Sequence, residues 1–169
     1  PVQNVPPIQK RLIRMCRAAA KPVIVATQML ESMIESPMPT RAEVSDVATA
    51  IYEGADAVML SAESAAGDFP IEAVQTMDNV AREVEQDPTY REIIEASRVV
   101  EHRSVAVGIV SAAREIAETT DIKAICCFTQ SGTTALLTAR ERPRVPIIAM
   151  TPLVNTARRL ALTWGTNCV

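Results

Sequence analysis

The sequence predicts an α/β fold with parallel strands, because it contains two short apolar runs separated by a helix. Residues 23–26 and 57–60 lack the polar alternation of a half-exposed strand and are typical of strands buried on both faces. Between them, Thr40 and Glu43 have the spacing of a capping box, and Gly54 follows the last apolar position of the helix. Strand, helix and strand in this order form a parallel crossover unit.

The spacing of these strands favours a barrel. The two strand starts lie 34 residues apart, close to the roughly 31 residues per unit of a TIM-type (β/α)8 barrel of about 250 residues. Barrel enzymes place catalytic groups at the carboxyl ends of the strands. Thr27 and Gln28 follow the first strand, and Ser61 and Glu63 follow the second. We therefore expect a site at this edge.

The remaining periodicity divides the chain into three parts. Residues 1–86 read as part of the barrel, 87–103 as a polar connector, and 104–169 as part of a C-terminal domain. Helices are expected over 7–20, 40–54, 70–84, 89–96, 105–116, 133–141 and from 152, with strands over 122–128, 145–150 and from Val169. The last part predicts an incomplete αβα parallel sheet with an open edge.

Composition limits the classes of function. No apolar run approaches the roughly 20 residues of a membrane span, and no signal peptide is recognised, so a cytoplasmic protein with no membrane partner is expected. Aromatic residues make up 3% of the chain, which argues against nucleic-acid binding. The four cysteines have no CxxC spacing and are interpreted as reduced core thiols. The basic residues of the first helix, Arg17 among them, are interpreted as a solvated face.

Residues alone leave the role of each polar group open. The Thr27 hydroxyl could donate a proton in a site or bond to backbone. The turn Thr129-Gln130-Ser131-Gly132-Thr133-Thr134 precedes a helix and fits a helix cap or an anion site. Residues 121–169 hold six basic and two acidic side chains, a balance of +4 that suits an anionic ligand. His102 lies in the connector and is interpreted as a solvent-exposed residue.

The stretch KPVIVATQMLESMIESPMPTRAEVSDVATAIYEGADAVMLSAESAAGDFPIEAV resembles the last two barrel units of pyruvate kinase. The later segments FTQSGTTA and RPRVPIIAMTP resemble that family's C-terminal domain. The resemblance covers essentially the whole chain. It implies the last two β/α units of the barrel, followed by an incomplete effector domain, within an enzyme several times longer.

The resemblance also implies an activity: transfer of phosphate from phosphoenolpyruvate to ADP, giving pyruvate and ATP in glycolysis. It makes Thr27 the residue implicated in protonating the enolate and places Gln28, Ser61, Glu63 and Ser64 on the substrate side. The family's Ser-Gly-Glu-Thr motif reads Ser-Ala-Glu-Ser here, with Ala62 and Ser64 as the two changes. Residues Thr129, Gln130, Ser131, Gly132, Thr133 and Thr134 match the family's effector loop, which implies a sugar-phosphate or nucleotide effector.

The family requires Mg²⁺ (or Mn²⁺) and K⁺, whose ligands match positions upstream of Pro1, so no metal ligand is assigned in this chain. A homotetramer is implied for the full-length enzyme, and the chain alone is expected to bind no metal and to be inactive. Two other functions remain open. One is a module that only binds an anionic effector, and the other is a barrel lyase acting on pyruvate-like acids, which the second domain disfavours.

Overall fold

The computed structural model describes residues 1–26, 28–98 and 104–169. They form two compact units: the first contains residues 1–14 and 23–97, and the second contains 15–22 and 98–169. Both are α/β, as predicted. Thr27 and His102 lie outside the described residues. Within the described part, no helix is both long enough and apolar enough to cross a membrane.

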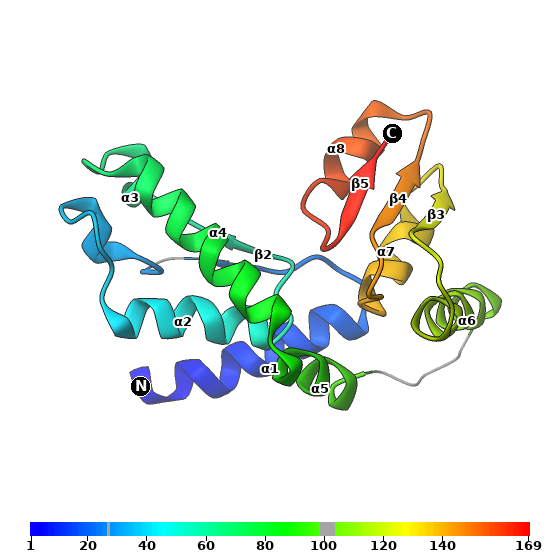
Figure 1. Ribbon diagram of the computed structural model, residues 1–169, viewed down its shortest axis with the longest axis horizontal. Coiled ribbons are helices and arrows are strands. Elements are labelled where there is room, and N and C mark those ends of the chain that lie inside the picture. Colours follow the sequence, from blue (N-terminus) through cyan, green and yellow to red (C-terminus); the bar gives the residue numbers. More distant parts are fainter. Residues whose placement is uncertain (27, 99–103) are drawn as a thin grey trace. The chain divides into compact units, whose positions relative to one another are not determined.

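The first unit is built on two parallel strands, β1 (Ile24–Ala26) and β2 (Ala57–Met59), paired from Ile24 with Ala57 to Ala26 with Met59. Its other elements are α1 (Val5–Ala18), the 3₁₀ helix η2 (Glu31–Ile34), α2 (Arg41–Tyr52), α3 (Ala62–Ala65), α4 (Pro70–Gln86) and α5 (Pro88–Ala96), and a 3₁₀ turn, η1 (Val2–Asn4), precedes α1. Helices α2 and α4 lie side by side along the sheet (Figure 1). The crossover β1, α2, β2 is the predicted one.

Helix α5 packs into the core of the first unit. Tyr90 and Ile94 are 2% and 1% exposed, and the Tyr52 hydroxyl donates to Asp87 at 2.6 Å, which ties the end of α2 to the start of α5. The polar sequence around this helix led to its interpretation as part of a connector. Its two buried side chains explain why it groups with the first compact unit.

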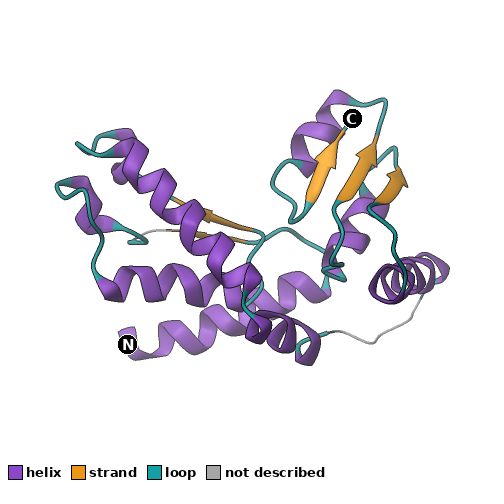
Figure 2. Ribbon diagram, viewed as in Figure 1, coloured by secondary structure: helices purple, strands orange, loops and turns teal. Residues whose placement is uncertain are grey.

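The second unit contains α6 (Val105–Thr119), β3 (Ile125–Phe128), α7 (Thr133–Arg140), β4 (Ile147–Met150), α8 (Val154–Leu160) and β5 (Thr166–Cys168). Its strands form a parallel sheet in the order β3, β4, β5 (Figure 2). Cys127, Ala149 and Leu160 are at most 4% exposed and belong to one core with Ala135 and Ala139 of α7. This core covers one face of the sheet.

The opposite face differs from the prediction of strands buried on both sides. Cys126 is exposed and Phe128 is 80% exposed, and both alternate along β3 with the buried Cys127. In the first unit, Ile24 and Met59 are 43% and 41% exposed. The described elements pack against one face of each sheet, so the strands have only half of the covering that their apolar sequences suit.

Element boundaries also differ from expectation at the chain's ends. Helix α1 runs over Val5–Ala18, two residues earlier than predicted, and α8 begins at Val154, two residues later than predicted. The Thr151 hydroxyl accepts from the Leu153 amide in the turn before α8. Strand β5 is Thr166–Cys168 and precedes Val169. The short helices η2 and α3 were not predicted, because four residues carry no readable helical period.

Buried arginines and one buried carboxylate lie at the carboxyl end of α7, where the end of α1 joins the second unit. Glu141 is 2% exposed and accepts from Arg98 Nε and Arg140 Nη2, both at 3.0 Å. Arg17 is 5% exposed, and its Nε donates to the Arg140 carbonyl at 3.2 Å. Arg17 therefore caps the carboxyl end of α7, and its interpretation as part of a solvated face was wrong.

The capping box at α2 predicts a pH-dependent stability. Burial raises the pKa of Glu43, but hydrogen bonds from Ser32 and Thr40 outweigh burial and bring that pKa to about 2, below its ordinary 4.5. The ionised form is thus favoured by folding. Its contribution is complete above pH 4.5 and is lost as the pH falls from 4.5 to 2.

We expect Glu43→Gln to lower the free energy of unfolding by about 1 to 3 kcal/mol at pH 7, because the cap and the Ser32 bonds weaken. Urea titrations of the 169-residue chain at pH 7 and at pH 2.5 measure this, and the difference from wild type should shrink at the lower pH. Asp46→Asn, an exposed carboxylate of the same helix, is the control. A loss equal at both pH values would contradict the assigned pKa.

Candidate functional site

The predicted rim lies where β1 and β2 end, because parallel strands bring their carboxyl ends to one edge. Two loops form it: the first rim loop, residues 28–40, and the second rim loop, residues 60–69. Gln28, Ser61 and Ser64 are exposed there. Gln28 has φ of +54°, a left-handed conformation that costs a non-glycine residue energy. Thr27, the expected proton donor, lies outside the described residues.

Glu63 lies on the rim but does not face solvent. It is 3% exposed; its Oε1 accepts from the Leu30 amide at 3.3 Å and its Oε2 from the Ser61 amide at 2.7 Å. One carboxylate therefore bonds to both rim loops. Charge buried in this way requires such donors.

The two changes in the Ser-Ala-Glu-Ser motif are accommodated locally. Ala62 starts α3 and is exposed, and the positive-φ residues of the described chain do not include it, so this position does not need glycine. The Ser64 hydroxyl donates to the Ser61 carbonyl at 3.4 Å, within the first turn of the same helix. Both residues are compatible with the rim geometry.

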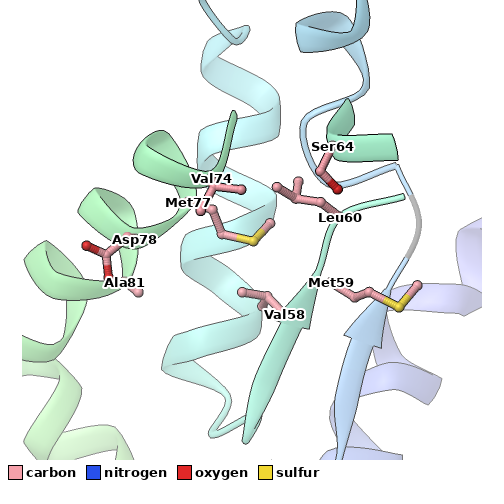
Figure 3. Close-up of a pocket in the computed structure, with 8 residues that line it drawn as sticks. All are labelled: Val58, Met59, Leu60, Ser64, Val74, Met77, Asp78 and Ala81. Carbon is pink, nitrogen blue, oxygen red and sulfur yellow. The ribbon is translucent and has the colours of Figure 1, made fainter. Parts of the chain in front are cut away.

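Two cavities of the first unit lie beside the sheet and are mostly apolar. One of 460 Å³ separates β2 from α4 and is lined by Val58, Met59, Leu60, Ser64, Val74, Met77, Asp78 and Ala81 (Figure 3). Another, of 370 Å³, lies between α1 and β1. Neither carries the cationic groups that a phosphorylated ligand requires. These cavities are poor candidates for the substrate site.

The described residues do not assemble a metal centre. No group of three or more His, Cys, Asp or Glu side chains is placed to hold an ion in the described ranges. Divalent metals that assist phosphoryl transfer take oxygen ligands from such groups. We therefore assign no metal ligand and derive no step through a metal.

The second candidate site is the turn 129–134 at the start of α7. Gly132 has φ of +90° and is the N-cap residue, and its amide donates to the Thr129 hydroxyl at 2.9 Å. Thr129 is buried and thus supports the turn. Gln130, Ser131, Thr133 and Thr134 are exposed beside the free amides of the helix start. The Ser131 and Thr133 hydroxyls are 2.9 Å apart.

Helix α8 holds this turn from the other side. The Thr156 hydroxyl donates to the Gln130 carbonyl at 2.9 Å, and Arg159 Nη2 donates to the Ser131 carbonyl at 2.7 Å. Both carbonyls therefore have a partner, and the exposed hydroxyls and the amides of the helix start can donate to a ligand. Such a surface suits an anion.

The +4 balance of residues 121–169 is not concentrated at this turn. Arg140 and Arg142 lie at the carboxyl end of α7, and Arg142 is 1% exposed with its guanidinium 4.9 Å from the Trp164 ring centre. Lys123 pairs with Asp121, and Arg144 pairs with Glu118 at 2.6 Å. Of the six basic residues, Arg159 bonds to the turn itself, and Arg158 is its neighbour in α8. The charge argument from the sequence was therefore too coarse.

Comparison with known proteins agrees with this arrangement. A model described as the pyruvate kinase barrel domain matches residues 1–74, and one described as the pyruvate kinase alpha/beta domain matches residues 108–169. The chain is 55% identical to a pyruvate kinase of Methylorubrum extorquens over 167 residues, covering 99% of this chain and 35% of that protein. A pyruvate kinase of Clostridium acetobutylicum is 45% identical over 171 residues, covering 99% and 35%.

A crystal structure of a pyruvate kinase from Cryptosporidium parvum is similar with a TM-score of 0.94 and 40% identity, covering all of this chain and 34% of that one. The two matches follow one another along the chain, with part of a barrel domain first and an alpha/beta domain second, in agreement with the two α/β units described above. The chain belongs to the pyruvate kinase family. It spans about a third of the length of these relatives.

Sequence reasoning missed the side chains that hold these sites in place. Glu43 was recognised as half of a capping box, but its bonds to the Ser32 amide and hydroxyl, at 2.7 and 2.5 Å, join residues 11 apart. Arg159 holds the turn from 28 residues away. No local pattern predicts such pairs.

A substitution at Gly132 tests whether close contact with α8 constrains the turn. A Cβ there would lie 3.3 Å from Leu160 Cδ2 at a φ of +90°. We expect Gly132→Ala to destabilise the chain by about 1 to 3 kcal/mol, from backbone strain plus crowding. Gly165→Ala is the matched control, since its φ is +62° with nothing within 4 Å. Denaturant unfolding that shows equal losses for both variants would mean that contact with α8 does not constrain the turn.

Proposed function

We propose that this chain contributes the substrate-protonating rim and the effector turn of a pyruvate kinase. In the full-length enzyme, phosphoenolpyruvate and ADP give pyruvate and ATP, a cytoplasmic step of glycolysis that needs Mg²⁺ and K⁺. The observation that carries the proposal is the parallel pairing of β1 and β2, which gathers the ends of both motif-bearing strands at one edge. Matches to both family domains support it.

In this proposal β1 and β2 are the last two strands of an eight-stranded barrel. Each has one edge without a partner strand among the described residues, and a mostly apolar cavity, of 370 or 460 Å³, lies beside each strand. Apolar surface of this kind is suited to further barrel elements. The metal ligands and the cations that neutralise the transferring phosphate then come from those elements.

The rim acts after phosphate leaves phosphoenolpyruvate. The enolate that remains needs a proton at carbon, and the Thr27 hydroxyl is the proposed donor, resupplied from solvent. Gln28, Ser61 and Ser64 are exposed at the same edge and are proposed to border the substrate. Phosphoryl transfer itself depends on metals and cations instead of these groups.

We expect Thr27→Val, in a full-length pyruvate kinase containing this segment, to lower turnover by about 10² to 10⁴ while phosphoenolpyruvate binding stays within about tenfold. The variant removes a group used mainly in proton transfer. Solvent-proton incorporation into pyruvate is compared with phosphoryl transfer to ADP. If both run at the wild-type rate, Thr27 has no role in protonation.

The turn 129–134 is proposed to bind a phosphate of a sugar-phosphate or nucleotide effector in a homotetrameric enzyme. The exposed donors Ser131 and Thr133 and the amides of the α7 start support this role. Binding there regulates the enzyme without contributing to chemistry. This is the one function that the second unit supports by itself.

Replacing Ser131 and Thr133 together with Ala should abolish effector activation and spare basal turnover. Two lost hydroxyl donors to a phosphate correspond to about 3 to 6 kcal/mol of binding. Calorimetry with fructose 1,6-bisphosphate and with AMP measures the affinity. The double variant Thr119→Ala and Thr120→Ala, which removes exposed hydroxyls at the end of α6, is the control. Unchanged affinity in the Ser131 and Thr133 variant would reduce the turn to a helix cap.

A further inference from the structure

The side chain of Glu63 joins the two rim loops close to the strands. Its oxygens accept from the amide of Leu30 at 3.3 Å, in the first rim loop, and from the amide of Ser61 at 2.7 Å, in the second. Glu63 is 3% exposed; its bond with Leu30 is buried and its bond with Ser61 is partly buried. Both carboxylate oxygens of Glu63 thus bond to backbone amides of the rim loops.

The same loops also meet backbone to backbone farther from the strands. The Asp68 amide donates to the Ile34 carbonyl at 2.8 Å. At Gly67, an added Cβ would lie 2.8 Å from the Glu63 carbonyl oxygen, closer than real Cβ contacts allow, and 3.1 Å from Ile34 Cα, a tight contact. Glycine is thus required here for space.

The interior between the loops is filled by apolar side chains. Leu30 and Met33 are both 0% exposed, and η2 contacts α3. The loops are therefore joined by a carboxylate near the strands, a packed middle and a backbone bond at the far end. Two loops that are joined at three places in this way move together.

From this arrangement we infer that Glu63 is a positioning residue of the rim: its carboxylate fixes the two loops relative to each other and takes no proton during the reaction. The inference rests on the proposed function. Fixing the loops fixes the rim groups that they carry, Gln28 and Ser61 among them. Misplacement of reacting groups by about 1 Å costs on the order of 100-fold in rate.

The first test measures hydrogen exchange in the 169-residue chain. Glutamine at position 63 keeps one acceptor oxygen but turns an NH₂ group toward the other amide. We expect Glu63→Gln to speed exchange of the Leu30 and Ser61 amides by about tenfold or more, the loss of one charged hydrogen bond. Asp46→Asn is the control, because Asp46 is an exposed carboxylate of α2 outside both rim loops and its loss should leave these two amides unchanged.

Unchanged exchange at both amides in Glu63→Gln would overturn the inference. Should that variant not fold, Glu63→Asp serves in its place, because aspartate keeps the charge but is one methylene too short to reach both amides. Leu30 and Ser61 amides that exchange in Glu63→Asp at the wild-type rate, or more slowly, would also overturn the inference.

The second test separates positioning from proton transfer in a full-length pyruvate kinase containing this segment. We expect Glu63→Gln to lower kcat by about 10- to 100-fold. The pH profile should keep its shape, and phosphoryl transfer and solvent-proton incorporation should fall by the same factor. Asp46→Asn, which changes an exposed carboxylate of α2 outside both rim loops, should leave all three unchanged.

Loss of one limb of the pH profile, or a fall in proton incorporation alone, would make Glu63 an acid–base group and overturn the inference. A wild-type full-length enzyme without pyruvate kinase activity would instead refute the proposed function, and with it the catalytic part of this inference. The exchange measurement would still decide whether Glu63 holds the loops. The two failures are thereby distinguished.

Discussion

The bonds from the Leu30 and Ser61 amides to the buried Glu63 carboxylate are the constraint on which the first unit's site depends. Parallel strands bring chain ends to one edge, but the loops beyond them have no ladder to pair with. Their amides still need acceptors when they are buried. The Glu63 side chain of the second rim loop supplies both acceptors. Gly67 permits the close approach of this loop to Ile34 in the first rim loop.

The second unit solves a similar problem with groups of opposite charge. Guanidinium groups occupy the carbonyls around α7: Arg159 bonds to Ser131 at its start, and Arg17 bonds to Arg140 at its end. Glu141 pairs with Arg98 and Arg140, so the arginines at the helix end accompany a buried carboxylate. Most of the arginines of this part of the chain thus have partners within the second unit.

The parallel α/β character, the β1, α2, β2 crossover and the capping box follow from the sequence because they are local: apolar runs, a helical period and a spacing of three residues. The exposed face of β3, with Cys126 and Phe128, could not be predicted from β3 alone, since burial depends on elements packed from elsewhere. The same holds for Glu63. The family resemblance places it on the substrate side of the rim, but the motif alone could not predict that its carboxylate bonds to two backbone amides. Motif letters identify a region of the site, but they do not determine which way a side chain points.

Under the proposed function, this chain holds the protonating and positioning groups of a pyruvate kinase, and the charge-neutralising groups belong to other parts of the enzyme. The most direct test assays the purified 169-residue chain, shown by mass spectrometry to be free of host enzyme, for ATP formation from phosphoenolpyruvate and ADP at saturating magnesium and potassium. We expect no turnover, because a proton donor cannot replace electrostatic stabilisation of the transferring phosphate. Turnover that Thr27→Val abolishes would contradict it, since a working site would then exist within this segment.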